Sequence, residues 1–209
     1  MHDEVKAKYL ERMPLLEDLA TILEKETKDA LADIPHIDRV AFRAKQAQSF
    51  TDKALDPRNN PSYLDPFVEI EDQVAGRVIV FFLSDLKIVH RRLEGTFSPV
   101  EWTIRRPSRD EEFGYESDHL ILIIPPHLKT KDWAMRNDMP STFELQIRTL
   151  FMHAWAEPQH DMGYKAAQEL TREIRRELAW IAASAWGADQ AYDRVFQRLF
   201  EKMLHEPER

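Results

Sequence analysis

Four side chains that can bind phosphate lie close together in the first third of the chain: Arg43, Lys45, Ser49 and Lys53. If Arg43 and Lys45 lie on a strand, their spacing of two directs both cations to one face of a sheet. Ser49 and Lys53, four residues apart, would share one face of the helix that follows. Because cations and a helix N-terminus both stabilise negative charge, this junction is typical of a polyphosphate site. The same residue types also decorate ordinary solvated surfaces, and that alternative stays open.

Two carboxylates accompany apolar segments of strand length, Asp72 at the edge of one and Glu144 inside another. Magnesium ions in phosphate-transfer sites take oxygen ligands, usually one or two carboxylates completed by substrate phosphates. Around Glu144 the period of two places Glu144, Gln146 and Arg148 on one face. Three polar groups there are costly in a core strand unless they meet a ligand or partners. We therefore expect a Mg²⁺ site at Asp72 and Glu144, with a solvated edge strand as the alternative.

Two further motifs combine residues that could touch a nucleotide or a metal. Gly114 permits a tight turn, and the ring of Tyr115 beside it could stack on a base. His153, Glu157 and His160 would align on one helix face, as in a set of metal ligands. A proline between the last two removes a hydrogen bond from that turn, so we favour a structural role for this set.

Hydrophobic periodicity predicts the elements that must position these residues. Apolar residues at steps of three and four predict a helix over residues 4–31. Strands are expected at residues 37–45, 74–83, 97–105, 117–124 and 142–148, and short helices at residues 49–55 and 85–93. Surface loops are expected at residues 56–66, which are dense in proline and asparagine, and at residues 107–114, which are rich in charge.

From residue 150 onward the pattern is helical, and we expect two C-terminal helices over residues 167–186 and 189–204. Their apolar stripes predict a cap packed on the sheet or, alternatively, an interface of a homo-oligomer; they include Leu170, Ile174, Leu178 and Ile181. The fold class is then α+β, with a mixed sheet of about five strands flanked by helices. One compact domain would comprise an N-terminal helix (1–35), a core (36–166) and a two-helix extension (167–209).

Composition excludes several classes of protein and site. The 209 residues contain no cysteine, so thiolate zinc sites, disulfides and cysteine nucleophiles are ruled out. A net charge of −8 argues against a broad electrostatic grip on duplex nucleic acid, although clustered Arg and Lys can still hold phosphates in one cleft. There is no apolar run of the roughly 20 residues that span a bilayer and no apolar leader at residues 1–8, so a cytoplasmic location is expected.

In their order along the chain, these motifs resemble the RelA/SpoT synthetase domain, with a match over residues 39–165. The matching motifs are Arg43-x-Lys45-x3-Ser49-x3-Lys53, Asp72 with Arg77 five residues on, Gly114-Tyr115-x-Ser117-x-His119, Glu144-x-Gln146-Ile147-Arg148-Thr149, and His153-Ala-Trp155-Ala-Glu157-x2-His160. No single motif is diagnostic, but five motifs in this order at compatible separations argue against coincidence. The flanking helices and the length are similar to those of the small alarmone synthetases.

The resemblance implies a nucleotidyltransferase-like mixed sheet and a synthetase of the (p)ppGpp type. Such an enzyme transfers the β,γ-pyrophosphate of ATP to the 3′-hydroxyl of GTP or GDP and releases AMP. By family analogy, Arg43 and Arg77 would sandwich the adenine of ATP. Lys45, Ser49 and Lys53 would hold its phosphates.

The same resemblance assigns the catalytic and acceptor residues. Asp72 would bind Mg²⁺, and Glu144 would bind or face the same metal and deprotonate the acceptor 3′-hydroxyl. Tyr115 would stack on the acceptor base, with His119 and Gln146 beside it. Our own candidates for the acceptor phosphates are Arg105 and Arg106.

Two other functions remain open. The acceptor could be an adenosine nucleotide or the 3′ end of a tRNA, as in toxic small members of the family; a basic track for tRNA could comprise Arg91, Arg92, Arg105, Arg106 and Arg109. Alternatively, the chain could be a catalytically silent nucleotide-binding regulator, which the presence of Asp72 and Glu144 disfavours.

Three departures from the family pattern touch the acceptor side in our interpretation. The glycine expected three residues after Asp72 stands one place later, at Gly76. Glu116 occupies a position where many members have a basic residue. Pro158 and Gln159 replace a more familiar pair of one apolar and one acidic residue.

Overall fold

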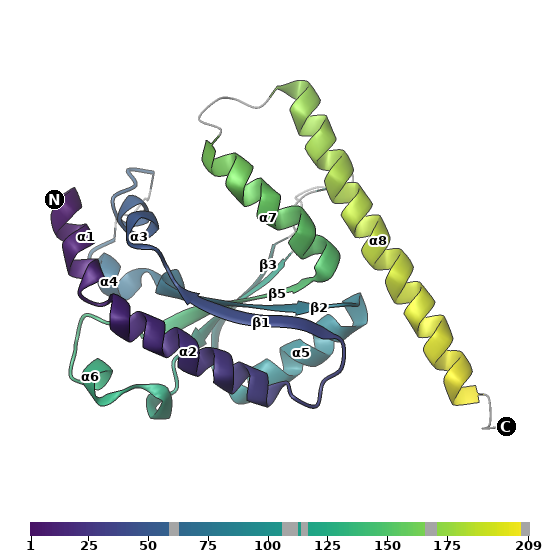
Figure 1. Ribbon diagram of the computed structural model, residues 1–209, viewed down its shortest axis with the longest axis horizontal. Helices are drawn as coiled ribbons and strands as arrows, with labels where there is room; N and C mark the ends of the chain where they lie inside the picture. Colours follow the sequence, from purple (N-terminus) through teal and green to yellow (C-terminus); the bar gives the residue numbers. More distant parts are fainter. Residues whose placement is uncertain (59–62, 106–112, 114–116, 166–170, 206–209) are drawn as a thin grey trace.

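A computed structural model describes residues 1–58, 63–105, 113, 117–165 and 171–205 (Figure 1). Five strands form one mixed sheet in the order β1 (Ile37–Ala44), β2 (Val74–Val80), β5 (Thr142–Thr149), β4 (Ser117–Ile123) and β3 (Pro99–Arg105). The central pair β2 and β5 is parallel, and the other three neighbouring pairs are antiparallel. The predicted α+β fold with a mixed sheet of about five strands is therefore confirmed.

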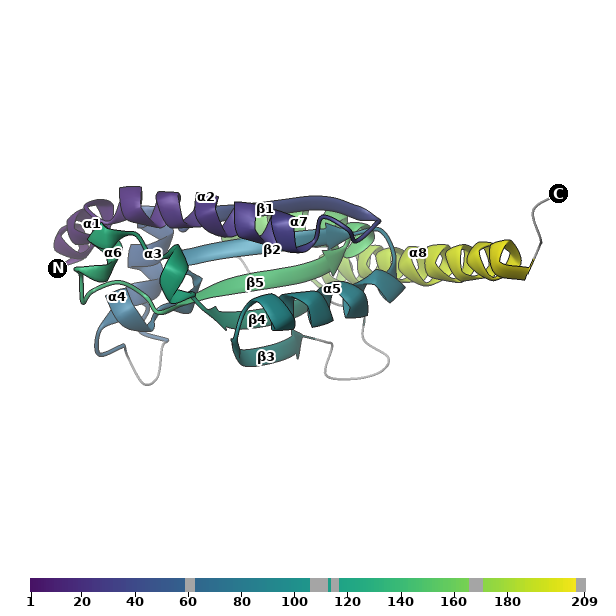
Figure 2. The ribbon, with the colours of Figure 1, turned by 90° about the horizontal axis from the view of Figure 1, so that it is seen from below.

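The hydrophobic core lies on one face of this sheet. Helices α2 (Met13–Ala30) and α5 (Leu83–Thr96) cover that face, as Figure 2 shows. Their apolar stripes meet the inward side chains of the central strands; the fully buried members include Leu16, Leu23, Leu93, Val78 and Leu145. Burial on this scale stabilises the fold by about 1.5 to 3 kcal/mol for each large side chain. The opposite face of the sheet is therefore left for polar side chains.

The single N-terminal helix that we predicted over residues 4–31 is wrong, because the chain forms α1 (His2–Leu10) and then α2. Pro14 explains the break, since it cannot donate a helical hydrogen bond and restricts the residue before it. Arg12 lies at the bend and is fully buried, and its Nη2 donates to the carbonyl of Phe67 at 3.0 Å. The bend thus ties the N-terminal helices to the segment before β2.

Short helices occupy much of the segment between β1 and β2. Helix α3 (Ala47–Ala54) follows β1, close to the predicted helix. Helix α4 (Pro66–Glu69) begins where the predicted loop ends, and the side chain of Asp65 accepts from the backbone N–H of Phe67 at 3.0 Å. A 3₁₀ turn, η1 (Glu71–Gln73), then leads into β2, so Asp72 lies in this turn and not on a strand.

Two more short helices, η2 (Pro126–Leu128) and α6 (Lys131–Ala134), connect β4 to β5. After β5 the chain enters α7 (Leu150–Lys165), which contains Pro158. Helix α7 lies on the side of the sheet opposite α2 and α5 (Figure 1). It is the main helical cover of the polar face among the described residues.

The two C-terminal helices that we predicted are one continuous helix, α8 (Arg172–His205). We had placed a break near Gly187, but a glycine keeps its backbone N–H and costs only about 1 kcal/mol within a helix. In the described part of the chain no helix is long and apolar enough to cross a membrane.

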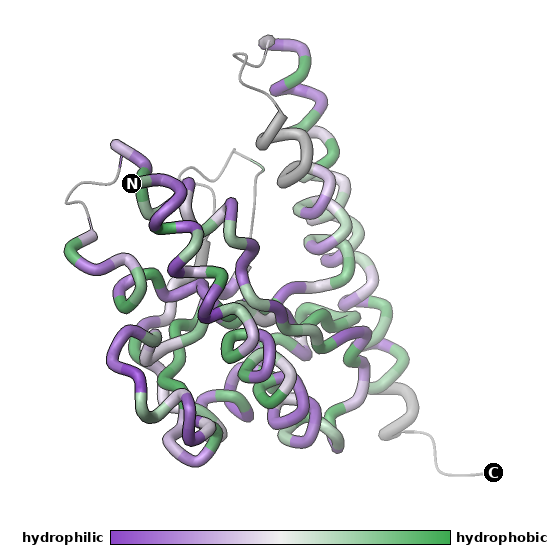
Figure 3. The backbone as a smooth tube through the Cα atoms, turned by 60° about the vertical axis from the view of Figure 1, so that its left-hand side comes forward, coloured by the Kyte–Doolittle hydropathy of each residue, from purple (hydrophilic) through white to green (hydrophobic). Residues whose placement is uncertain are grey.

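Helix α8 packs against the core along only part of its length. The Oγ1 atom of Thr149 donates to Asp189 Oδ2 at 2.6 Å, and the backbone N–H of Ser84 donates to Asp193 Oδ1 at 2.9 Å. Apolar and polar residues are interspersed along α8 (Figure 3), and Trp180 is 73% exposed. Ile174 and Ile181, from the stripe predicted to pack on the sheet, are also exposed, so that prediction is wrong for these two residues.

The displaced glycine, Gly76, lies on the apolar face of β2, where it pairs with Phe42 of β1. A Cβ atom added at Gly76 would lie 2.4 Å from both Cε1 and Cζ of Phe42. Ala75, at the position where the family has glycine, faces the polar side between Arg43 and Glu144. Our interpretation that this departure touches the acceptor side is therefore wrong for Gly76, which makes room for the ring of Phe42.

We predict that Gly76→Ala destabilises the protein by about 1 to 3 kcal/mol, because the added methyl group forces the Phe42 ring out of its packed position. Urea unfolding followed by circular dichroism measures the change. Gly187→Ala is the matched control, since a Cβ atom there meets no heavy atom within 4 Å and alanine favours a helix. Equal stability of Gly76→Ala and the wild type would contradict this account of the glycine.

Candidate active site

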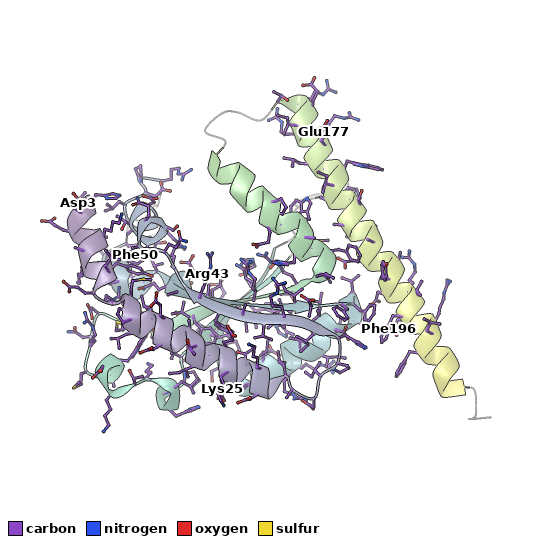
Figure 4. All side chains as sticks on the ribbon, viewed as in Figure 1. Asp3, Lys25, Arg43, Phe50, Glu177 and Phe196 are labelled. Atoms are coloured by element: carbon purple, nitrogen blue, oxygen red, sulfur yellow. The ribbon has the colours of Figure 1, made fainter. Side chains whose placement is uncertain are left out.

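The polar face of the sheet gathers the predicted site residues into two rows that cross the strands. In one row Arg43 pairs with Ala75, which pairs with Glu144. In the other row Arg77 pairs with Gln146, and Gln146 pairs with His119. Paired residues point to the same side of a sheet, so these side chains share one face. Figure 4 shows Arg43 on β1 between α3 and α7.

Asp72 binds the two predicted phosphate lysines at one edge of this face. Lys45 Nζ donates to Asp72 Oδ2 at 2.6 Å, and Lys53 Nζ donates to Oδ1 at 2.9 Å. Burial alone would raise the pKa of Asp72, but the two ammonium groups outweigh it and hold the pKa below its ordinary value. The same carboxylate raises the pKa of Lys53 against the effect of burial. The prediction that these cations converge at the strand-to-helix junction is confirmed for Lys45 and Lys53.

Backbone contacts fix this junction. The backbone N–H of Lys45 donates to the carbonyl of Gln73 at 2.8 Å, and the hydroxyl of Tyr9 donates to the carbonyl of Lys45 at 3.0 Å. Gln73 is fully buried, and its amide donates to the carbonyls of Phe67 and Ile70 at 2.8 and 2.9 Å. Sequence reasoning missed Gln73 and Tyr9, although a glutamine directly before an apolar strand is a signal of a buried polar contact.

Glu144 occupies the centre of the face with two hydrogen-bond partners. The Nδ1 atom of His119 lies against Glu144 Oε1, and Gln146 Nε2 donates to the same oxygen at 3.2 Å. Burial raises the pKa of Glu144, but the bonds from His119 and Gln146 lower it further than burial raises it. The negative charge of Asp72 also raises the pKa of Glu144, so the two carboxylates lie close enough to interact electrostatically. Both are held ionised near neutral pH.

Arg77 points toward α7, where its Nη1 donates to Glu157 Oε1 at 2.6 Å. The same oxygen lies 3.8 Å from Arg148 Nη1 and 3.9 Å from His153 Nδ1. Burial lowers the pKa of His153, and Arg77 and Arg148 lower it further against the opposing effect of Glu157. Glu157 therefore interacts with both Arg77 and Arg148. No group of three or more His, Cys, Asp or Glu suited to a metal occurs among the described residues, and the His160 side chain lies outside them.

Fewer contacts are described for the remaining predicted site residues. Arg43 is exposed, and its side chain makes no hydrogen bond or ion pair with another residue that the structure describes; Ser49 is half-buried one turn before Lys53 on α3. Arg105 ends β3, but its side chain lies outside the described residues. Tyr115 and Arg106 lie outside them altogether. The structure thus brings the donor-side residues and Glu144 together.

The donor set around Asp72 and Glu144 fits a hard divalent cation. Both groups are carboxylates held in their ionised form, and no hydrogen bond from a described residue reaches Glu144 Oε2. Magnesium is usually bound by one or two protein carboxylates, with phosphates and water as the other ligands. With lysines beside them, these carboxylates can accommodate the phosphates of a nucleotide together with a cation.

The sequence matches a known protein family and is similar to a named relative. The family model described as a region found in RelA / SpoT proteins matches residues 42–169. The GTP pyrophosphokinase YjbM of Bacillus subtilis (strain 168) is 26% identical over 185 residues, which cover 86% of this chain and 79% of that protein. This relative is close enough in length to be compared along most of the chain.

Solved structures of the small alarmone synthetase 1 from Bacillus subtilis share the fold. One superposes with a TM-score of 0.78 at 23% identity and covers 93% of this chain and 98% of the other. The form bound to its product pppGpp gives 0.76 at 22% identity, with 92% and 98% covered. The form bound to AMPCPP gives 0.70 at 22% identity, with 93% and 98% covered.

We predict that Asp72→Asn destabilises the protein by about 1 to 3 kcal/mol at pH 7, because two ammonium groups lose their charged acceptor. The pKa of Asp72 is lower in the folded state, so its contribution is complete above the ordinary aspartate value of about 3.9. The contribution is lost as the pH falls below that value. The difference between wild type and variant should shrink from pH 7 to pH 3 in urea unfolding experiments.

Asp29→Asn is the control for this titration. Asp29 accepts from Lys25 at 2.6 Å on the exposed side of α2, and such pairs contribute only about 0.5 kcal/mol. A pH-independent effect of Asp72→Asn, parallel to that of the control, would show that the Asp72 ion pairs do not stabilise the fold.

Proposed function

The chain belongs to the RelA/SpoT family, and we propose that it transfers the β,γ-pyrophosphate of ATP to the 3′-hydroxyl of GTP or GDP and releases AMP. One observation carries this proposal. Asp72, bound by Lys45 and Lys53, lies beside Glu144, which is held by His119 and Gln146. A polyphosphate donor needs the first group, and activation of a hydroxyl needs the second.

On the donor side, the two lysines are the residues that bind the phosphates of ATP. Both ammonium groups are bound to Asp72. A triphosphate offers them stronger acceptors, so they can exchange one charged partner for another at little cost in desolvation. Ser49, on the same face of α3 as Lys53, adds a hydroxyl donor. The exchange releases the Asp72 carboxylate.

Arg43 and Arg77 would bind the adenine between them. They lie diagonally on neighbouring strands β1 and β2, with Ala75 and Ala41 as their small pairing partners. A guanidinium plane stacks well on an aromatic ring, and two such planes on one face can enclose a base. Arg77 is steadied by Glu157. This arrangement supports a purine nucleotide as the donor.

Asp72 and Glu144 would hold Mg²⁺, which when bound neutralises charge on the phosphates and orients them. The residues of the chain account for the rest of the chemistry. Glu144 accepts the proton of the 3′-hydroxyl as the 3′-oxygen forms a bond to the β-phosphorus and the bond from that phosphorus to the oxygen of AMP breaks. Positioning and charge neutralisation contribute most of the acceleration, and proton removal contributes about 10² to 10⁴.

The guanosine acceptor is proposed from the relatives, because the curated relative is named a GTP pyrophosphokinase and a solved relative is bound to pppGpp. In this chain His119 lies against Glu144, near the start of β4. Tyr115, Arg105 and Arg106 remain predicted acceptor residues. The shared fold supports this assignment without fixing the base.

The acceptor is tested by incubating the protein with Mg²⁺ and γ-labelled ATP and, separately, GTP, GDP, ATP or deacylated tRNA. We expect label on GTP or GDP and release of AMP, which thin-layer chromatography resolves. A labelled adenosine nucleotide with a new 3′-pyrophosphate, resolved from the supplied ATP, or labelled tRNA would replace the proposed acceptor and retain the pyrophosphate transfer. No labelled product, with ATP still bound, would favour a nucleotide-binding regulator.

We predict that Glu144→Gln lowers kcat by about 10² or more, because an amide cannot accept the hydroxyl proton, and leaves ATP binding within a few-fold of wild type. Equilibrium binding of an ATP analogue and steady-state kinetics separate the two effects. Glu94→Gln, an exposed carboxylate on α5 on the opposite side of the sheet, is the matched control and should retain full activity. Near-normal turnover in Glu144→Gln would remove Glu144 from the mechanism.

A further inference from the structure

Gln146 is bound on both sides by residues of its own strand. Its Nε2 donates to Glu144 Oε1 at 3.2 Å, and its Oε1 accepts from Arg148 Nη2. A guanidinium has donors only, so it must meet the oxygen of the amide, and an ionised carboxylate has acceptors only, so it must meet the nitrogen. The orientation of the Gln146 amide is therefore imposed from both ends.

Arg148 is itself held firmly. Its side chain is 6% exposed, its Nε lies 3.4 Å from Ser117 Oγ, and its Nη1 lies 3.8 Å from Glu157 Oε1. Glu157 in turn binds Arg77 at 2.6 Å. A buried arginine has a fixed fork of donors and cannot lose its charge. Arg148 thus holds the Gln146 amide rigidly, although Arg148 lies two residues beyond Gln146, on the side away from Glu144.

The support has a consequence for Glu144. Both His119 Nδ1 and Gln146 Nε2 are directed to Oε1, and no hydrogen bond from a described residue reaches Oε2. One carboxylate oxygen of Glu144 is therefore held from two sides by the protein.

We propose that Arg148 is a positioning residue that acts through Gln146 to hold Glu144 Oε1 and so to fix the carboxylate that receives the proton of the reacting hydroxyl. The proposal deepens the proposed function and rests on it only for the identity of that hydroxyl. It also changes the role of Gln146, whose amide is directed to Glu144 and Arg148 and supports the base. The donor arginine Arg77 joins the same chain of contacts through Glu157.

The first test does not depend on turnover. In protein with ¹⁵N-labelled glutamine side chains, the Gln146 amide signal, assigned with Gln146→Leu, is compared in wild type and Arg148→Leu. We expect the amide protons of Gln146 to exchange with water at least tenfold faster in Arg148→Leu, because the amide loses the guanidinium that fixes its oxygen.

The second test measures kcat and KM for both nucleotides in Gln146→Leu, Arg148→Leu and the double variant. We expect each single variant to lower kcat by about tenfold while KM stays within a few-fold of wild type. The double variant should have a kcat no lower than that of Gln146→Leu, because both residues act through one hydrogen bond. Arg136→Leu, which removes a partly exposed arginine paired with Asp138, is the matched control and should leave both constants unchanged.

The proposal is overturned if Arg148→Leu leaves the exchange of the Gln146 amide at its wild-type rate, or if the two single losses of kcat multiply in the double variant. If Arg148→Leu does not fold, Arg148→Lys gives the same comparison, since a single ammonium lacks the fork that reaches Gln146 and Glu157 together. Failure of all acceptors to gain label would reject the proposed function, whereas the amide exchange would still decide the role of Arg148.

Discussion

The parallel register between β2 and β5 is the constraint on which the site depends. It sets Ala75 opposite Glu144 and Arg77 opposite Gln146, and it brings the η1 turn with Asp72 to the end of the strand that carries Glu144. A slip of one residue would turn Glu144 and Gln146 into the core and the apolar Phe143 and Leu145 outward. Because Leu145 and Phe143 are fully buried, the hydrophobic core enforces the register that the polar face requires.

Charge balance is the second requirement, because the site keeps two carboxylates largely out of water. Asp72 accepts hydrogen bonds from two ammonium groups, and Glu144 is hydrogen-bonded by His119 and the Gln146 amide. These partners hold each carboxylate ionised, which removes a cost that ligand binding would otherwise meet. A chain with a net charge of −8 can handle a polyphosphate because its cations are concentrated beside Asp72 and along β1 and β2.

Helices remote from the reacting groups complete the support. Thr149 ends β5, accepts from the backbone N–H of Met152 at 3.2 Å and donates to Asp189 of α8. The start of α7, and with it the helix that carries Glu157, is thus attached to α8. Phe196 of α8 stacks on Phe82 with ring centroids 4.2 Å apart, beside the beginning of α5. The long C-terminal helix therefore fixes the far end of the sheet while much of its apolar surface stays exposed.

The sequence by itself determined the strands and the polar face of the sheet. Period-two alternation is a local property of the chain, so the shared face of Glu144, Gln146 and Arg148 followed from spacing alone. Proline and glycine effects were harder to judge, since Pro14 divides the N-terminal helix whereas Gly187 leaves α8 continuous. The outcome depends on packing that the local sequence does not encode.

Only the tertiary structure decided which polar groups meet. The pairing of Asp72 with two lysines, the contact of Glu157 with Arg77 and the contact of His119 with Glu144 join residues from different elements. Such contacts depend on strand order and register, which arise from the burial of Phe143, Leu145 and Val78 against α2 and α5. The chain specifies the chemistry of its side chains locally, and the core fixes their partners.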